Sequence, residues 1–358
     1  AAFFDYNWSV SRVLDVDAPL HVNLDAFGVS SPRQLRGCVM RPEPLERDVA
    51  PGVVLGRRPD PLRRVGVYVP GGRAAYPSSV LMGVVPARVA GVDEVVVCSP
   101  PGADGRPPAL VMAACAVGGA DRLFAVGGAG AVAAMAYGTG TVPRVDRIVG
   151  PGNAYVTEAK RQVTSAVAID SPAGPSELLV LADGTADPEV VAVELIAQAE
   201  HDPDAAVVLV TADAALAQAT AAALGRRVPE TPRREIVEAS LERAGGLLVA
   251  DRMADAIAFT ERYAPEHLLI LTAAPRETLQ QVRSAGTVFL GPRSSVAFGD
   301  YATGANHVLP TGGLARSYSG LSTDDFVRWT TWQEVSTEDA ARTLAAVAAP
   351  LADAEGLP

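Results

Sequence analysis

Short valine-rich runs alternate with alanine-rich stretches from residue 65 onward, and this alternation limits the folds that the chain can adopt. The runs RVGVYV, EVVVCSP and ELLVLAD are apolar without polar alternation, which predicts strands buried on both faces. The stretches between such runs, for example PALVMAACAVGG, predict helices. This order of strands and helices predicts an α/β fold with largely parallel sheets that are covered by helices.

The number of these units exceeds what one compact sheet holds, and 358 residues are enough for two α/β domains with separate cores. Because 49% of the residues are hydrophobic, disorder is excluded. The first 50 residues show no period of either kind, and we expect them to form a short arm. The segment from about residue 323 to the end predicts helices without strands.

The charge and cysteine content narrow the class of function. Lys and Arg number 30 against 41 Asp and Glu, and this net charge of -11 argues against a nucleic-acid partner. The three cysteines form no CxxC pair, which fits a reducing compartment. No apolar run reaches the roughly 18 residues of a membrane span, and the first residues lack the basic lead of a signal peptide. We therefore expect a cytoplasmic enzyme with no membrane partner.

Polar side chains share one face of the apolar helix predicted from about Pro188, in the segment EVVAVELIAQAEHDP. Glu194, Gln198 and His201 follow at i, i+4 and i+7 and therefore lie on one stripe. An amide oxygen and an imidazole nitrogen on one stripe can bind one cation, and Zn²⁺ accepts such mixed ligands. The alternative is a histidine at a helix end that bonds to a loop or interacts with the helix dipole.

Two further clusters place a histidine beside other polar groups. In YAPEHLLIL, Glu266 and His267 stand at the start of a predicted strand, where both can be held rigidly for acid and base chemistry. In FGDYATGANHVLPTGG, Asp300, Asn306 and His307 lie among glycines, as in a site loop. A surface pair and an isolated turn are the alternatives to these two interpretations.

Glycine-rich turns separate several strands from the helices that follow, and such turns present helix amides to an anion. In VGGAGAVAA, Gly128, Gly130 and Ala133 match G-x-G-x-x-A, a weak form of the dinucleotide-binding fingerprint. Tight packing turns give the same match. The polar turn DSPAGPSE adds Ser176 as a candidate substrate contact.

The order of these motifs resembles that of the histidinol dehydrogenases over residues 48–357. The segments that carry the resemblance include GVYVPGG, VGGAGAVAAMAYGT, VDRIVGPGNAYVTEAKRQV, AIDSPAGPSE, AQAEHDPDA, YAPEHL and GDYATGANHVLPT. The resemblance implies a zinc-dependent, NAD-linked enzyme of two Rossmann-like domains. Such an enzyme oxidises L-histidinol through histidinal to L-histidine with two NAD⁺, the last step of histidine biosynthesis.

The resemblance also implies roles for individual residues. Gln198, His201 and Asp300 occupy the positions of Zn²⁺ ligands, with one Zn²⁺ per subunit, and Glu266 and His267 occupy those of the acid and base pair. The implied cofactor contacts are Tyr68 and Asn153. The implied substrate contacts are Ser176, Gln198, His201, His267, Asp300, His307 and Glu355.

The implied mechanism is two hydride transfers at one site, in which zinc orients the substrate. His267 takes the hydroxyl proton in the first transfer, and Glu266 then activates water to attack the aldehyde. Because an unperturbed imidazole titrates near pH 6.5, we expect activity to fall on the acid side.

The domains follow from the same resemblance. Residues 51–67 and 176–322 are expected to form a discontinuous metal and substrate domain, into which an NAD-binding domain of residues 68–175 is inserted. Residues 323–358 are expected to form a helical tail that completes the site of the partner in a homodimer. Residues 1–50 form an arm that is atypical of the family.

Three departures from the family pattern concern the sites. Gly130 stands where the family usually has a glutamine that contacts the dinucleotide, and Val296 replaces a common carboxylate. The family's fourth zinc ligand is a histidine five residues beyond the position of Glu355, and the sequence ends three residues after Glu355. These departures keep two alternatives open: a related dehydrogenase of another small alcohol, such as a sulfonated diol, and a non-catalytic NAD-binding relative. The AEGL context of Glu355 favours histidinol.

Overall fold

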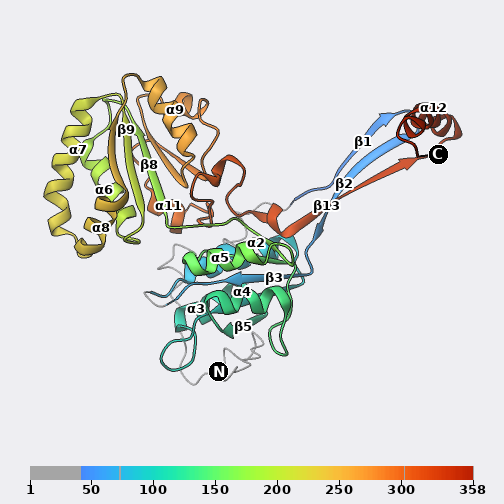
Figure 1. Ribbon diagram of the computed structural model, residues 1–358, viewed down its shortest axis with the longest axis horizontal. Helices are drawn as coiled ribbons and strands as arrows, with labels where there is room; N and C mark the ends of the chain where they lie inside the picture. Colours follow the sequence, from blue (N-terminus) through green and yellow to red (C-terminus); the bar gives the residue numbers. More distant parts are fainter. Residues whose placement is uncertain (1–41, 72–73, 302, 358) are drawn as a thin grey trace.

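The computed structural model describes residues 42–71, 74–301 and 303–357. Two α/β domains lie side by side, and a long arm projects from them (Figure 1). Each domain is built on a five-stranded parallel sheet. The α/β fold class predicted from the alternating runs is confirmed. Within the described residues, no helix has the length and apolar character needed to cross a membrane.

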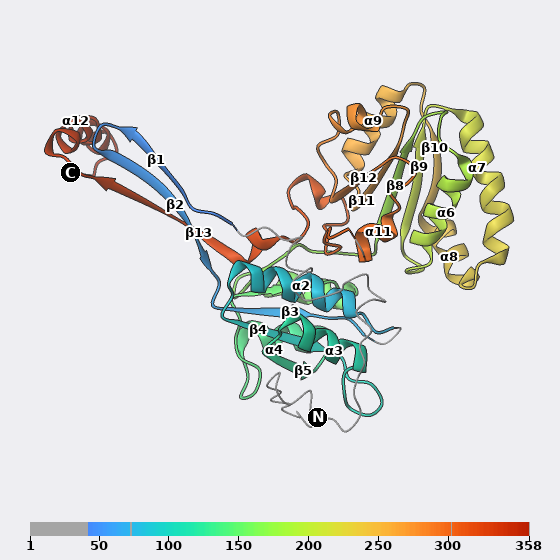
Figure 2. The same cartoon turned by 180° about the vertical axis from the view of Figure 1, so that it is seen from behind.

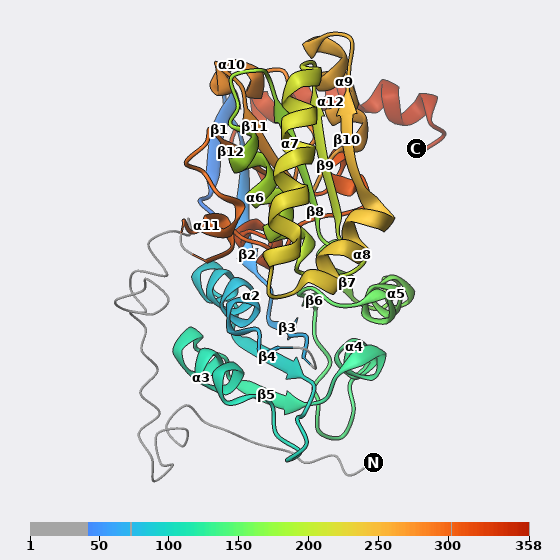
Figure 3. The same ribbon diagram turned by 90° about the vertical axis from the view of Figure 1, so that its left-hand side faces the viewer.

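The first domain has the strand order β5-β4-β3-β6-β7. Its strands are β3 (Arg64–Tyr68), β4 (Glu94–Ser99), β5 (Arg122–Ala125), β6 (Arg147–Val149) and β7 (Ala168–Ile169). Helices α2 (Pro77–Ala90) and α3 (Ala109–Gly118) pack on one face of the sheet, and α4 (Gly128–Tyr137) and α5 (Ala154–Gln162) pack on the other (Figure 3). Because both faces are covered, the central strands are apolar over most of their length.

The second domain has the strand order β10-β9-β8-β11-β12. Its strands are β8 (Glu177–Ala182), β9 (Ala206–Thr211), β10 (Gly245–Val249), β11 (His267–Leu271) and β12 (Thr287–Leu290). Helices α6 (Pro188–Ala199), α7 (Ala214–Arg227) and α8 (Arg234–Ala244) pack on one face of the sheet. Helices α9 (Met253–Tyr263) and α10 (Pro275–Leu279) pack on the other, and the short helix α11 (Val296–Tyr301) follows β12.

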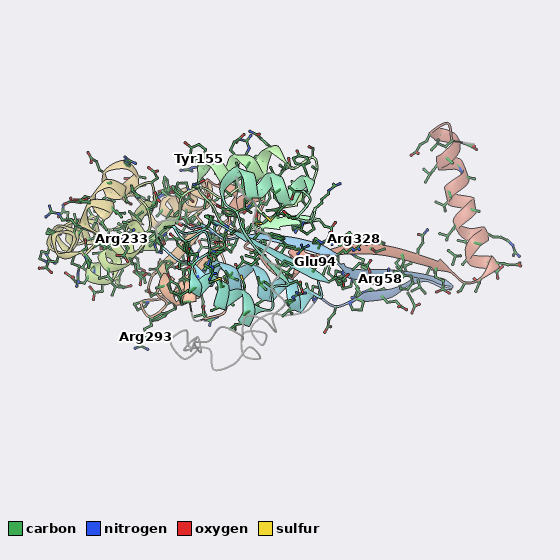
Figure 4. All side chains as sticks on the ribbon, turned by 90° about the horizontal axis from the view of Figure 1, so that it is seen from below. Arg58, Glu94, Tyr155, Arg233, Arg293 and Arg328 are labelled. Carbon is green, nitrogen blue, oxygen red and sulfur yellow. The ribbon has the colours of Figure 1, made fainter. Side chains whose placement is uncertain are left out.

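The arm is a three-stranded antiparallel sheet of β1 (Leu45–Ala50), β2 (Val53–Pro61) and β13 (Val327–Val335). Helix α12 (Glu338–Ala354) follows β13 at the far end of the arm, well away from both domains (Figures 1 and 2). Arg58 and Arg328 both lie along the arm (Figure 4), and each forms an ion pair with Asp60.

The structure differs from the expected organisation in two places. Residues 323–358 contain β13 as well as α12, so the prediction of a tail without strands is wrong. The strand was missed because an exposed arm strand, VRWTTWQEV, lacks the apolar run of a buried one. Residues 51–67 contribute β2 to the arm and most of β3 to the first sheet, where β4 and β6 flank it. The prediction for residues 1–50 lies outside the described residues except for 42–50, which include β1.

Candidate active site

Glu266 and His267 lie at the beginning of β11 and are almost fully buried, with 5% and 4% of their surface exposed. Helix α9 ends at Tyr263, and Ala264 adopts a left-handed conformation that turns the chain toward the strand. In the parallel register His267 pairs with Leu178 of β8. The acid and imidazole pair therefore lies at the edge of the second sheet where its strands begin.

The main chain of Glu177 contacts both members of this pair. Its N–H donates to Oε2 of Glu266 at 2.7 Å, and its carbonyl oxygen lies 3.0 Å from Nδ1 of His267. A carbonyl oxygen only accepts, so Nδ1 carries the hydrogen and Nε2 is left with the lone pair. Nε2 lies 3.9 Å from Oδ1 of Asp300. The contact thus presents the basic nitrogen of His267 toward Asp300.

The electrostatic surroundings shift the two site histidines in opposite directions. Burial by itself lowers the pKa of His267, but the Glu266 carboxylate, 3.4 Å from Nδ1, and then Asp300 outweigh burial and raise the pKa above its ordinary value. Burial lowers the pKa of His307, and Asp300 offsets only part of this effect. His267 is therefore the better proton acceptor, whereas His307 favours the neutral form.

A hydrogen bond connects helices α6 and α11, one turn before the predicted zinc ligand of each helix. The backbone N–H of Val296, which begins α11, donates to Oε2 of Glu194 at 3.2 Å. Gln198 follows Glu194 by four residues and Asp300 follows Val296 by four residues. Burial, and then the carboxylates of Asp300 and Glu200, raise the pKa of Tyr301, the last residue of α11.

The residues at these helix ends fit a zinc ion by their donor chemistry. Gln198 is buried, and His201 is exposed beyond the end of α6 with its Nδ1 3.3 Å from the Gln198 carbonyl oxygen, which leaves Nε2 available. Amide oxygen, imidazole nitrogen and the carboxylate of Asp300 form a mixed set that Zn²⁺ accepts. In the described part of the chain, no group of three or more His, Cys, Asp or Glu side chains could hold a metal ion. The set proposed here is not such a group, because one of its three members is a glutamine. Glu194, the third member of the predicted stripe, is engaged with α11 instead.

The loop after α11 connects the two domains at the site. Nδ1 of His307 lies 3.3 Å from the Asp300 carbonyl oxygen, and its Nε2 lies 3.4 Å from Oγ of Ser79 in α2. The amide of Asn306 donates to the carbonyl of Met82 in the same helix at 2.9 Å. Helix α2 follows β3, so the site lies where the carboxyl ends of the first sheet's strands face the beginnings of the second sheet's strands. Ser79 was not predicted, although the YPSS sequence after a glycine turn was a usable signal.

The predicted cofactor contacts both lie at the carboxyl edge of the first sheet. Tyr68 ends β3, and its hydroxyl oxygen accepts from the N–H of Gly128 at 3.1 Å, at the beginning of α4. Asn153 precedes α5, and its side chain accepts from two backbone N–H groups of that helix. Gly130 is exposed in the first turn of α4, and a Cβ atom there would meet nothing within 4 Å.

Two other residues predicted to contact the substrate lie in very different places. Ser176 immediately precedes Glu177 and β8, next to the buried pair. Glu355 is the capping residue directly after α12. Because α12 lies at the far end of the arm (Figure 1), this chain does not bring Glu355 to its own site.

The side chain of Glu177 was missed by the sequence analysis. Its Oε1 accepts from the N–H of Gly312 at 2.9 Å, and its Oε2 is buried with no hydrogen-bond partner among the residues that the structure describes. Burial and then the neighbouring Glu266 carboxylate raise the pKa of Glu177. Only its position beside Ser176 and before a buried strand could have drawn attention to it.

The candidate site therefore joins two α/β domains, with a buried acid and imidazole pair at the edge of the second sheet. Solved structures with related folds include an acetylating aldehyde dehydrogenase from Geobacillus thermoglucosidasius, with a TM-score of 0.57 and 11% identity over 86% of this chain and 82% of that chain. At that identity only the fold is shared.

Closer similarity comes from histidinol dehydrogenases. The crystal structure of histidinol dehydrogenase from Elizabethkingia anophelis matches with a TM-score of 0.90 and 36% identity, covering 97% of this chain and 80% of that chain. The curated histidinol dehydrogenase of Methanothermobacter thermautotrophicus is 51% identical over 310 residues, which are 87% of this chain and 72% of that protein. The curated histidinol dehydrogenase of Natronomonas pharaonis is 54% identical over 312 residues, which are 87% of this chain and 73% of that protein.

The model of the family described as histidinol dehydrogenase matches residues 36–358. The chain therefore belongs to the histidinol dehydrogenase family and is a dehydrogenase. The resemblance drawn from the motifs is confirmed.

Proposed function

We propose that this protein oxidises L-histidinol through histidinal to L-histidine, with zinc as a bound metal and two NAD⁺ as hydride acceptors. One observation carries this proposal beyond family membership: the buried His267 presents Nε2 toward Asp300 while Glu177 and Glu266 surround Nδ1. This arrangement suits a general base whose lone pair faces a substrate bound next to the metal ligand Asp300.

The metal would be held by Gln198, His201 and Asp300, on the ends of two connected helices. Bound zinc would supply a fixed positive charge that holds the imidazole and amino nitrogens of the substrate and so orients its alcohol carbon. His307, kept neutral by burial, is placed to contact the substrate from the loop between the domains.

His267 acts as the base in the first oxidation. Its Nε2 accepts the proton of the substrate hydroxyl while the carbon that bears this hydroxyl transfers hydride to NAD⁺. The imidazolium that forms is stabilised by the Glu266 carboxylate and by the Glu177 carbonyl oxygen at Nδ1. Glu266 then accepts a proton from the water that attacks histidinal, and the hydrate loses the second hydride.

The dinucleotide would bind at the carboxyl edge of the first sheet, where Tyr68 and Asn153 lie. NAD⁺ accepts hydride at its nicotinamide ring, so this edge must face the buried pair, and the contact between Ser79 and His307 brings the two edges together. The absence of a side chain at Gly130 should weaken dinucleotide binding relative to relatives with glutamine.

The functional unit would be a cytoplasmic homodimer in which the tail of each chain reaches the site of the other. Large apolar side chains of α12 are exposed, with Val347 and Leu351 each 61% accessible, and strand β1 exposes Leu45 and Val49. A second copy that covers these side chains would remove them from water and bring its Glu355 toward the site.

The decisive experiment follows NADH formation from L-histidinol with purified protein, Zn²⁺ and NAD⁺. The proposal expects two NADH per histidinol and L-histidine as product. A protein that binds zinc and NAD⁺ but forms no NADH from histidinol would refute it.

A further inference from the structure

A lysine is among the largest fully buried side chains in the described part of the chain. Lys160 lies on α5 with a side chain only 2% exposed, and it forms an ion pair with Asp170, which is 5% exposed and follows β7. Its ammonium group also donates to the carbonyl oxygens of Gly150 at 3.1 Å and Ser171 at 3.3 Å. All three ammonium hydrogens therefore have acceptors.

The ion pair holds Gly150 from both sides. The Gly150 N–H donates to Oδ2 of Asp170 at 2.8 Å, and the Gly150 carbonyl accepts from Lys160. Gly150 has a φ of 114°, and a Cβ there would collide with the carbonyl oxygen of Tyr68. This backbone conformation therefore requires glycine, and the ion pair fixes it.

Both predicted cofactor contacts adjoin this glycine. Gly150 packs directly on the main chain of Tyr68, and it begins the turn that ends at Asn153, the capping residue of α5. Asn153 immediately precedes α5, and Lys160 lies within α5. The ion pair therefore also fixes the helix that Asn153 caps.

Stability alone does not explain a buried ion pair, because apolar residues of similar volume usually serve as well or better. We propose that Lys160 and Asp170 are positioning residues for dinucleotide binding, which hold the Gly150 peptide and, through it, Tyr68 and Asn153 in the arrangement that binds the cofactor. This inference rests on the proposed use of NAD⁺.

The test compares the double variant Lys160→Met/Asp170→Asn with wild type. The double change removes both charges, keeps the side-chain volumes, and leaves the asparagine oxygen able to accept from Gly150. Because methionine cannot donate to the carbonyl oxygens of Gly150 and Ser171, we expect the melting temperature to fall by up to about 8 °C while the fold is kept. The KM for NAD⁺ and the calorimetric Kd for NAD⁺ should rise about tenfold. The KM for histidinol and the zinc content should change less than about twofold. The matched control is Arg161→Met, which removes a neighbouring exposed cation from the same helix.

Unchanged NAD⁺ affinity in the folded double variant would overturn the inference and leave the proposed function intact. Wild-type protein that binds no NAD⁺ would overturn both. If the double variant does not fold, hydrogen exchange on the wild-type protein decides. The Gly150 N–H should exchange slowly even without NAD⁺, and exchange at the rate of an exposed loop would show that the ion pair does not hold this peptide.

Discussion

Replacing Glu194 by leucine tests whether α11 depends on α6 for its position. Glu194 is 8% exposed and accepts the N–H of Val296, the first residue of α11, at 3.2 Å. Gln198 and Asp300 each lie four residues further along these helices. The loss of this acceptor should therefore weaken the helix start and displace Asp300 relative to Gln198.

The magnitude follows from the burial of this hydrogen bond. A buried backbone N–H left without an acceptor costs about 1–3 kcal/mol, and the added apolar surface of leucine offsets part of that cost. We expect the free energy of unfolding to fall by about 1–2 kcal/mol. Replacing a residue that orients metal ligands typically lowers metal affinity by about 10–100-fold. The zinc affinity of Glu194→Leu should therefore fall by at least about tenfold. The Glu194→Gln variant keeps an oxygen acceptor, so its zinc affinity should fall by less than about threefold.

The assay is competition for zinc between the protein and a chromophoric chelator, together with unfolding by denaturant. Glu189→Gln is the matched control, because Glu189 lies on the same helix but pairs with Arg226 and Arg227 at the surface. If Glu194→Leu lowers stability yet binds zinc like wild type, then α11 does not rely on this contact, and the reasoning is refuted.

Four other predictions concern the base, the cofactor edge and the dimer. His267→Asn should lower kcat by about 10²–10⁴-fold with zinc content unchanged, and a variant retaining a tenth of wild-type kcat would exclude His267 as the base. Because the base must be neutral and Glu266 raises its pKa, wild-type kcat should fall with decreasing pH at a midpoint above about 6.5, whereas a profile flat down to about 5.5 contradicts this role. Gly130→Gln has open space for its side chain, so it should fold normally and lower the KM for NAD⁺; an unchanged KM argues against dinucleotide contact there. Val347→Glu should convert dimers to monomers in sedimentation experiments, and an intact dimer would exclude α12 from the interface.

Buried elements were predictable from sequence because burial leaves a pattern. Strands β3, β4 and β8 each begin with a charged residue and are otherwise largely apolar, since helices cover both of their faces. Strand β13 left no such signal because it pairs in an exposed arm. At the site, Glu266 and His267 were found as a dipeptide of suitable side chains. The contribution of Glu177 was missed because it acts on them through main-chain atoms, which every residue type has.

The two sheet edges that meet at the site differ in the helix ends that they present, and this difference fits the ligands proposed for them. At the carboxyl edge of the first sheet, α4 and α5 begin, and helix beginnings carry the partial positive charge that favours an anionic dinucleotide. In the second domain α6 runs antiparallel to the strands and ends beside the beginnings of β8 and β11, where its partial negative charge favours a cation. Parallel α/β domains usually bind ligands at the carboxyl ends of their strands. The reversed placement in the second domain therefore has a physical reason, because the opposite edge supplies the helix end that suits a metal ion.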